Sequence, residues 1–413
     1  MNFIKKLLLG AAVAALGATS AIAENVKIAF IDPLSGPFAA TGAEGLALYK
    51  FAAEELVNKK GGVLGGQKLE VVGFDNKISP KESLIQLQVA IDQGIRYVAQ
   101  GNSSGVANAL TDAIKKHNKR NPEDRVLFLN YSAVDPVLTN DKCNFWHFRF
   151  DANADIKMDA MTDVIASDES IKKVYIIGQD YSFGKAVAAA AVRFLGEKRP
   201  DIEIVGNELH PIGKVKDFTP YARKIMAAEA DVVITGNWGA DMVGLGKAVL
   251  DAGFEDSIYT YYAAGTGITK TFGADGVGKL KMVGEGKLNP PHSDAASAFV
   301  KAFKQANPDK DISQPRIANV VEMLAKAINE AGSATDVVKV AMALEGMEHD
   351  SLWGSKIKMR AEDHQAIQDV HILSHTDQGV VHDMDNSGFG LVAESTVSMA
   401  SADSATSCKM RRP

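Results

Sequence analysis

Polar side chains follow two predicted strands, in loops that could hold an anionic ligand. The loop Gln100 to Gly105 comes after the apolar run 97–99 and directly before a predicted helix, and it contains Ser103 and Ser104. Hydroxyl groups beside the free main-chain N–H groups of a helix N-terminus suit a carboxylate. The next strand ends in Asn130-Tyr131-Ser132-Ala133, a second polar cluster at the equivalent edge. An ordinary helix cap by Ser103 or Ser104 is the alternative, and it accounts for only one hydroxyl.

Aromatic residues occur in three later loops that also follow predicted strands. These loops are Asp180-Tyr181-Ser182-Phe183, Gly236-Asn237-Trp238-Gly239 and Tyr261-Tyr262-Ala263. A single aromatic residue is usually part of a core, but three successive loops of this kind favour walls around the apolar part of a ligand. We therefore predict a ligand site made by Ser103, Ser104, Tyr131, Ser132, Ala133, Asp180, Tyr181, Trp238 and Tyr262.

The motifs of nucleotide binding and metal binding are incomplete or have another explanation. Gly178 to Ala186 resembles a P-loop, but it has one residue too many between its glycines and Ala186 where a Ser or Thr belongs. Asp383, Asp385, Ser387, Gly388 and Glu394 match the charged positions of a calcium loop, yet a turn between two strands explains them as well. The sequence therefore predicts a binding protein with no cofactor, no metal and no enzymatic activity.

The elements that carry these loops alternate between strand and helix. Runs such as 26–31, 69–74, 97–99 and 126–130 predict strands, with helices between them, and the same cycle recurs from 173 to 252. Ser79-Pro80-Lys81-Glu82 has the signature of a helix start, with Ser79 as the cap. Two α/β blocks, about 25–145 and 155–275, follow from this pattern. Packed against each other, they would leave a cleft in which the loops at the strand ends meet.

The N-terminus predicts export. Lys5 and Lys6 precede an apolar run, and Ala21-Ile22-Ala23 supplies the small residues that a signal peptidase accepts, so we predict a signal peptide, residues 1–23, cleaved after Ala23. A buried N-terminal helix is the alternative. The remaining 390 residues carry 43 basic and 51 acidic side chains. This balance provides no basic surface for nucleic acid.

Cys143 and Cys408 are the two cysteines of the chain. In an exported protein a disulfide between them is the natural pairing, and it would tie the C-terminus to the middle of the chain. Two buried thiols are the alternative.

An ordered set of segments resembles the type I periplasmic solute-binding proteins of the leucine/isoleucine/valine-binding family. The segments are Leu34-Ser35-Gly36-Pro37 with Thr41-Gly42, Lys60-Gly61-Gly62, Gly65-Gly66-Gln67-Lys68-Leu69, Asp75 with Ser79-Pro80, Asp92-Gln93-Gly94-Ile95, Asp180-Tyr181 with Gly184, and Asp217-Phe218. The resemblance covers essentially the whole chain after the signal peptide.

The resemblance implies a periplasmic binding protein-like I fold of two doubly wound α/β lobes. The N-terminal lobe would comprise 24–148 and about 287–366, and the C-terminal lobe about 149–286 and 367–413. Three crossovers would join them, and they would close on a solute by hinge motion. The implied function is that of the periplasmic component of an ABC importer, a monomer that delivers a small molecule to membrane permease subunits. A periplasmic sensing module of a signalling system is the alternative.

Carried over residue by residue, the family's carboxylate loops fall on Ser103 and Ser104 and on 132–134. Val134 departs from amino-acid binders, which have a hydroxyl residue there. The acid that pairs with the ammonium group of an amino acid is missing near Ala263 and Ala264. Either Asp180 or another acid replaces it, or the ligand has no ammonium group. The ligand is thus expected to be a branched-chain or hydrophobic amino acid, or a related small carboxylate that is aromatic or branched.

Overall fold

The strands form three sheets in the computed structural model, which describes residues 24–413; the predicted signal peptide and its cleavage site lie outside this range. The first sheet has five parallel strands in the order β2-β1-β3-β4-β5. They are β1 (Val26–Asp32), β2 (Leu69–Asp75), β3 (Tyr97–Gln100), β4 (Leu127–Asn130) and β5 (His147–Arg149).

The second sheet has seven strands in the order β15-β14-β10-β9-β8-β6-β7. They are β6 (Lys173–Gln179), β7 (Glu203–His210), β8 (Val232–Thr235), β9 (Ser257–Thr260), β10 (Leu280–Gly284), β14 (Val370–Thr376) and β15 (Gly390–Val397). The first five of these run parallel, whereas β14 and β15 are antiparallel to their neighbours. A small antiparallel sheet joins β11 (Glu348–Asp350), β12 (Lys356–Met359) and β13 (Ala366–Ile367).

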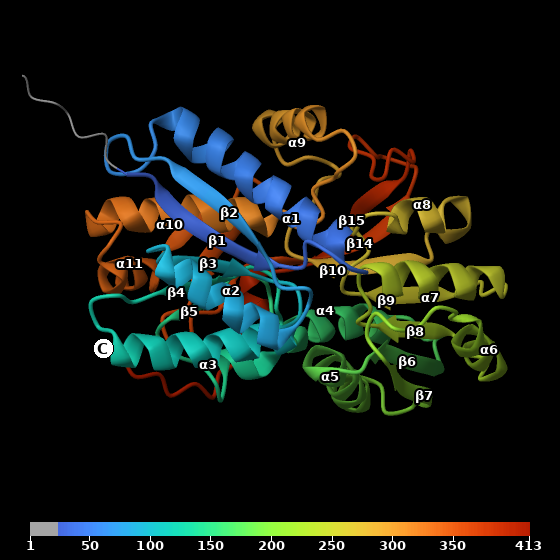
Figure 1. Ribbon diagram of the computed structural model, residues 1–413. Helices are drawn as coiled ribbons and strands as arrows, with labels where there is room; N and C mark the ends of the chain where they lie inside the picture. The colour runs from blue at the N-terminus through green and yellow to red at the C-terminus, as the bar shows by residue number, and fades with distance from the viewer. Residues whose placement is uncertain (1–23) are drawn as a thin grey trace, which may run out of the picture.

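Helices connect the strands and cover the sheets (Figure 1). They are α1 (Ala39–Ala52), α2 (Pro80–Asp92), α3 (Ser104–Arg120), α4 (Ala154–Ser167), α5 (Ser182–Lys198), α6 (Thr219–Ala227), α7 (Ala240–Asp251), α8 (Ile268–Phe272), α9 (Asp294–Ala306), α10 (Arg316–Ala331), α11 (Val337–Leu344) and α12 (Met399–Ala402). The predicted start of α2 is confirmed, because the Ser79 side chain accepts a hydrogen bond from the Glu82 N–H at 3.3 Å. None of the helices described is long and apolar enough to cross a membrane.

The chain crosses from the first sheet to the second after β5. It leaves the second sheet after β10 for α9, α10 and α11, which pack in the core of the first sheet, and it returns to the second sheet after β13. Figure 1 shows the two sheets side by side, each with its own helices. We use "first lobe" for residues 24–148 and 287–366 and "second lobe" for residues 149–286 and 367–413. This division follows the sequence analysis and stays a prediction.

Each large sheet has its own apolar core. The first sheet packs with α1, α3 and α10 into one cluster that includes Phe30, Phe128 and Leu324. The second sheet has a cluster on either face, one around Ile176 and the other around Val233. The two residues lie in adjacent strands, and their side chains belong to opposite faces.

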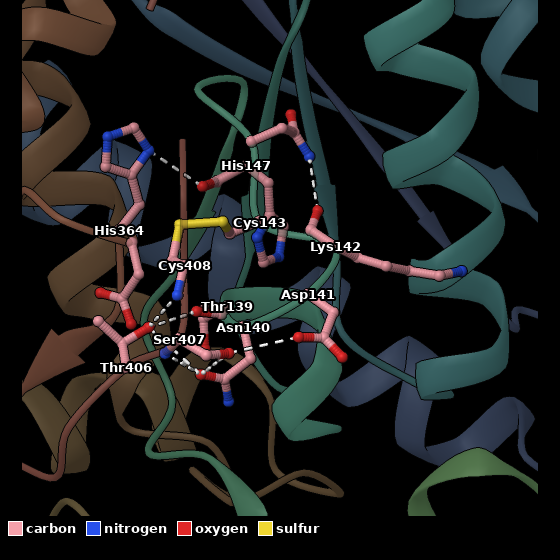
Figure 2. The surroundings of a disulfide bond; sticks show 12 residues. Thr139, Asn140, Asp141, Lys142, Cys143, His147, His364, Thr406, Ser407 and Cys408 are labelled. Atoms are coloured by element: carbon pink, nitrogen blue, oxygen red, sulfur yellow. Dashed lines mark hydrogen bonds between the residues drawn. A yellow bond between two sulfur atoms is a disulfide. The ribbon is translucent and has the colours of Figure 1, made fainter. Parts of the chain in front are cut away.

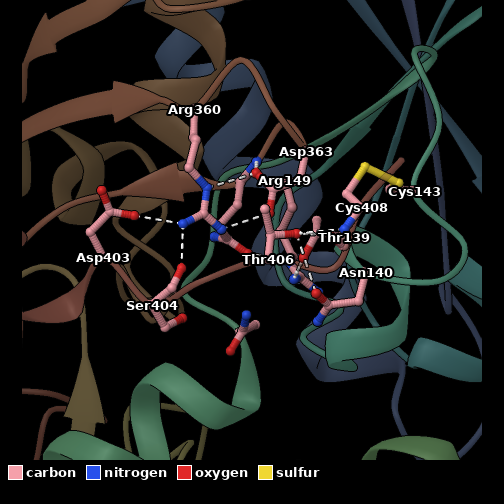
Figure 3. Close-up of polar contacts among 12 residues, drawn as sticks. Thr139, Asn140, Cys143, Arg149, Arg360, Asp363, Asp403, Ser404, Thr406 and Cys408 are labelled. Atoms are coloured by element: carbon pink, nitrogen blue, oxygen red, sulfur yellow. Dashed lines mark hydrogen bonds and ion pairs between the residues drawn. A yellow bond between two sulfur atoms is a disulfide. The ribbon is translucent and has the colours of Figure 1, made fainter. Parts of the chain in front are cut away.

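The C-terminal segment 403–412 lies on the first lobe, although the predicted division assigns it to the second. The predicted disulfide is confirmed: Cys143 and Cys408 are bonded, with their Cα atoms 5.8 Å apart (Figure 2). Thr406 donates to the main-chain oxygen of Thr139 at 3.0 Å. At the start of the same segment, Asp403 pairs with Arg360. The Arg360 guanidinium lies between Asp363 and Asp403, 2.6 Å from Oδ2 of Asp363 and 2.5 Å from Oδ1 of Asp403 (Figure 3).

Candidate functional site

A cavity lies between the two lobes, where the strand-end loops of both sheets face each other. Its space measures about 710 Å³, including the part open to solvent. The first lobe contributes Thr41, Gly101, Asn102, Ser103, Ser104, Ser132, Ala133, Val134, Ser313, Gln314, Pro315 and Arg316. The second lobe contributes Lys157, Tyr181, Phe183, Trp238, Gly239, Tyr261, Tyr262, Ala264, Gly265, Met282, Val283, Gly284, Glu285 and Gly286.

The N-terminus of α3 forms one wall of the cavity. Asp32, at the end of β1, fixes the loop that precedes α3, because its carboxylate accepts hydrogen bonds from the N–H groups of Gly101 and Asn102 at 3.1 and 2.9 Å. Ser103 has φ of 80°, which lies in the left-handed region, and its side chain caps no N–H of α3. The first N–H groups of a helix have no partner within the helix. The wall therefore offers an unused hydroxyl and main-chain donors where the positive end of the helix dipole faces the cavity.

Burial changes the ionisation of Asp32. Its side chain is fully enclosed, and desolvation raises the pKa of its carboxyl to about 7, although the Tyr131 hydroxyl and two main-chain donors pull the pKa the other way. Tyr131 donates its hydroxyl to Asp32 at 2.6 Å. The loop is thus held by a buried polar group rather than by apolar packing alone.

The loop after β4 supplies Ser132 and Ala133. The side-chain oxygen of Asn130 accepts the N–H groups of Ser132 and Ala133 at 3.2 and 2.7 Å, and this fixes the turn. The Ser132 hydroxyl accepts a hydrogen bond from Nη2 of Arg316 at 2.6 Å. Arg316 is the first residue of α10, so it reaches the cavity from a part of the chain that is far from Ser132 in the sequence.

Aromatic side chains form the opposite wall. Nε1 of Trp238 donates to the Tyr181 hydroxyl at 2.9 Å, and the Tyr261 hydroxyl donates to the main-chain oxygen of Ala154 at 2.8 Å. The Phe183 and Tyr261 rings meet edge to face with centroids 5.4 Å apart. Because their polar atoms have partners within the protein, these rings present mainly apolar surface to the cavity.

Four buried charged side chains meet at the crossovers beside the cavity. Nζ of Lys157 lies 2.6 Å from Asp151 and 2.8 Å from Glu285. The guanidinium of Arg316 lies 3.1 Å from Asp151 and 3.5 Å from Glu285. Burial opposes ionisation of Glu285, but Lys157 and Arg316 outweigh it and hold the pKa of the carboxyl below its usual range.

Three of these charged residues line the cavity and were missed by the sequence analysis: Lys157, Glu285 and Arg316. Glu285 directly follows β10, a strand that the predicted second block did not include. Recognising the run 280–284 as a strand would have placed an acidic residue at the same edge as the other strand-end loops. Lys157 and Arg316 lie inside or at the start of helices and carry no comparable signal.

Seven of the nine predicted site residues line the cavity: Ser103, Ser104, Ser132, Ala133, Tyr181, Trp238 and Tyr262. Tyr131 is not among the lining residues, because its ring is buried in the first-lobe core against Phe30, with centroids 5.8 Å apart. Asp180 is not among them either. Its side chain is 53% exposed and pairs with Lys185 at 3.2 Å. Tyr131 and Asp180 therefore lie outside the cavity lining, and the ligand-binding role predicted for the nine residues stays a prediction.

The side chains of the calcium-like run 383–394 bind different parts of the protein. Asp385 accepts hydrogen bonds from the Gly267 N–H at 2.6 Å and the Thr269 hydroxyl at 2.7 Å. Glu394 lies in β15 and pairs with Lys281 at 2.7 Å. Across residues 24–413, no group of three or more His, Cys, Asp or Glu side chains is arranged to hold a metal ion.

Comparisons with known proteins identify the family of this chain and match its fold. A family profile described as periplasmic binding protein matches residues 25–379. The Leu/Ile/Val-binding protein homolog 4 of Brucella melitensis is 32% identical over 365 residues, which cover 86% of this chain and 85% of that protein. A crystal structure of the leucine-, isoleucine-, valine-, threonine-, and alanine-binding protein from Brucella ovis in a closed conformation has 30% identity and a TM-score of 0.81, over 95% of this chain and all of that one.

A more distant structure shares the fold alone. It is a solute-binding protein of an ABC transporter from R. palustris in complex with benzoate, with 17% identity and a TM-score of 0.78 over 93% of this chain and 99% of that one. Together with the Brucella ovis structure, it confirms the predicted class of fold.

Proposed function

Because the chain belongs to the periplasmic binding protein family, we propose that it is the substrate-binding component of an ABC importer and captures a small carboxylate in the periplasm. The observation that carries this proposal is the cavity between the lobes, where the N-terminus of α3 faces a wall of aromatic rings. One wall suits an anionic group and the other suits an apolar body.

The carboxylate would bind at the N-terminus of α3. Ser103 offers a hydroxyl that caps no N–H of α3, and the first N–H groups of the helix point the same way. Ser104 holds the neighbouring loop instead, since its hydroxyl accepts the Asp135 N–H at 3.2 Å. We assign Ser103 and the main chain of Ser104 to direct contact with the ligand.

The apolar body of the ligand would lie against Tyr181, Trp238 and Tyr262. Val134 and Met282 extend this apolar surface from other directions. Val134 stands where amino-acid binders of the family have a hydroxyl residue, so this part of the cavity gains apolar surface and loses a donor. Branched aliphatic and aromatic bodies both fit such a surface.

An ammonium group would find its acceptor in Glu285. Oε1 of this carboxylate already accepts the Ala152 N–H at 3.0 Å and lies 2.8 Å from Lys157. The contact of Oε2 with Nη1 of Arg316 is long, at 3.5 Å, so this oxygen can accept a further donor. Glu285 thus replaces the acid that is missing near Ala263 and Ala264, and it supports a hydrophobic amino acid as the ligand. Benzoate is bound by the R. palustris structure, and this keeps a carboxylate without ammonium as the second candidate.

Export would place the protein where an importer needs it. The predicted cleavage after Ala23 would release a mature chain that begins at Glu24, and mass spectrometry of the exported protein tests this boundary. The loaded, closed form would then dock on the permease subunits as a monomer.

Thermal-shift measurements test the proposed ligand class. The mature protein is refolded to remove bound solute and is then mixed with L-leucine, the keto acid of leucine, or benzoate. A ligand present at about a thousand times its Kd stabilises the folded state by about 4 kcal/mol. Preference for leucine over its keto acid, lost in Glu285→Gln, supports an amino-acid binder. Equal or better binding of the keto acid or benzoate supports the second candidate, and no shift with any small carboxylate overturns the proposal.

A further inference from the structure

Phe38 of the first lobe is buried against the second lobe. It ends the segment that follows β1, and its neighbours Gly36 and Pro37 are exposed. Phe38 itself is only 2% exposed. Its ring lies 4.2 Å from the Trp238 ring, centroid to centroid, and it packs within the apolar cluster of the second lobe. The ring is therefore buried across the boundary between the lobes.

Two glycines of the second lobe make room for this ring. Gly213 follows β7 and Gly239 precedes α7, and their φ angles of 65° and 58° lie in the left-handed region. A Cβ atom on Gly213 would lie 2.8 Å from Cε2 of Phe38, and one on Gly239 would lie 2.7 Å from Cδ1. Both positions thus exclude a side chain as long as the Phe38 ring is in place. We call Gly213, Trp238 and Gly239 the socket.

The socket is connected to the wall of the cavity. Trp238 and Gly239 line the cavity, whereas Phe38 is not among the lining residues. Oδ2 of Asp241 accepts the Gly213 N–H at 2.8 Å and also lies 2.8 Å from Nε2 of Gln179. Phe38 therefore supports Trp238 from behind, on the side away from the ligand space.

We propose that Phe38 is a positioning residue for ligand capture: its ring enters the socket when the lobes close and thereby stabilises the closed form. This inference rests on the proposed function, because it requires that closure traps a ligand. An apolar ring that is exposed in the open form and buried in the closed form favours closure by the hydrophobic effect. Affinity depends on the fraction of protein that can adopt the closed form. The ring therefore slows release of the ligand without touching it.

A double-mutant cycle tests the fit between ring and socket. Phe38→Ala is expected to weaken binding by roughly 10- to 100-fold, mainly through faster release, and Phe38→Leu to restore most of the loss. Gly213→Ala is expected to weaken binding as well, because its Cβ meets the ring. In the Phe38→Ala background the same Gly213→Ala change is expected to have little further effect on affinity. Backbone strain at Gly213 would act equally in both backgrounds, so non-additivity identifies the ring as the cause.

L-leucine, its keto acid and benzoate serve as the probes, and stopped-flow fluorescence gives the association and release rates. The melting temperature of each ligand-free variant is the control, and it is expected to change little for Phe38→Ala. Additive effects of the two changes, or unchanged release in Phe38→Ala, would overturn the proposal.

A second measurement needs no ligand. The hydroxyls of Thr266 in the second lobe and Ser313 in the first both contact Oε2 of Glu44, at 3.2 and 2.8 Å. Cysteines placed at these two positions therefore come near each other only when the lobes close, and the rate at which a short bifunctional thiol reagent cross-links them reports closure. Phe38→Ala is expected to slow this rate roughly 10-fold or more, and an equal rate would count against the role of Phe38. If no probe binds but the rate falls, the proposed ligand class fails and the role of Phe38 stands.

Discussion

The hydroxyl of Tyr262 donates a hydrogen bond to the main-chain oxygen of Ser132 at 3.2 Å, from one lobe to the other. Tyr262 follows β9 in the second sheet, whereas Ser132 belongs to the loop after β4 in the first. Both residues also line the cavity. The contact therefore joins the aromatic wall to the polar wall beside the proposed ligand.

Tyr262→Phe is expected to weaken ligand binding about 3- to 10-fold, because it removes one hydrogen bond of the closed form and leaves the ring in place. Titration calorimetry with the best probe ligand measures the change. Tyr259→Phe is the matched control, since Tyr259 is a neighbouring tyrosine of the same sheet that does not line the cavity. Equal affinities in Tyr262→Phe and the wild type would show that the contact does not contribute to closure.

Removing one cation from the buried cluster is expected to destabilise the whole fold. Lys157 is 1% exposed and lies between the carboxylates of Asp151 and Glu285. Lys157→Met leaves two buried carboxylates with Arg316 as their single cation, and we expect the free energy of unfolding to fall by about 3 to 5 kcal/mol. Urea unfolding measures this difference.

Lys224→Met is the control for that experiment, because Lys224 pairs with Glu208 while its own side chain is 57% exposed. A pair in solvent contributes less than about 1 kcal/mol, so this variant is expected to unfold almost like the wild type. Similar losses of unfolding free energy in both variants would show that the buried cluster contributes no more to stability than an exposed ion pair.

Glu44 is expected to make stability depend on pH. It accepts the Asp311 N–H at 3.1 Å and the Ser313 hydroxyl at 2.8 Å, and burial, helped by the charge of Asp311, raises its pKa from 4.5 to about 8. Between these values the folded state holds a proton that the unfolded state releases. The stability that this proton gives is complete below about pH 4.5 and is lost as the pH rises through 8.

Glu44→Gln carries no titrating proton, so it serves as the reference for this effect. The unfolding free energy of the wild type minus that of Glu44→Gln is expected to fall as the pH rises from 5 to 8, by at most about 1.4 kcal/mol per pH unit. Urea unfolding at pH 5, 6.5 and 8 gives the difference. A difference that stays constant with pH, or rises, would mean that Glu44 ionises normally in the folded protein.

The strand-end loops could be predicted from the sequence because a parallel sheet places them together. Once the alternation of strands and helices is recognised, Ser103 and Ser132 must lie at one edge of the first sheet, and Trp238 and Tyr262 at one edge of the second. The direction of each side chain is decided by one residue of register. For this reason Tyr181 lines the cavity while the adjacent Asp180 points to solvent.

The charged cluster could not be predicted in the same way. Lys157, Glu285 and Arg316 lie in three segments that are far apart in the sequence. A single charged residue in such a segment is most simply read as exposed on the surface. The crossovers between the lobes bring these residues together. Local secondary-structure propensity does not predict such a long-range contact. Phe38 shows the same limit: in the sequence it is one apolar residue in a polar turn, and its burial depends on the other lobe.

The disulfide is expected to stabilise the protein by fixing the C-terminal segment to the first lobe. Cys143 and Cys408 are 265 residues apart, so the bond restricts a long part of the unfolded chain (Figure 2). The double variant Cys143→Ser, Cys408→Ser is expected to lose about 2 to 5 kcal/mol of unfolding free energy, measured by urea unfolding. Reductant should bring the wild type to the same level and leave the double variant unchanged.

Asp403→Asn separates the covalent contribution of this segment from its polar contacts. The Asp403 side chain is 50% exposed where it pairs with Arg360, so its loss is expected to cost less than about 1 kcal/mol (Figure 3). If the polar contacts held the segment, Asp403→Asn would destabilise the protein as much as the double cysteine variant does. If the bond holds it, only the cysteine variant and the reduced wild type unfold at lower urea, because only they free the long loop in the unfolded chain.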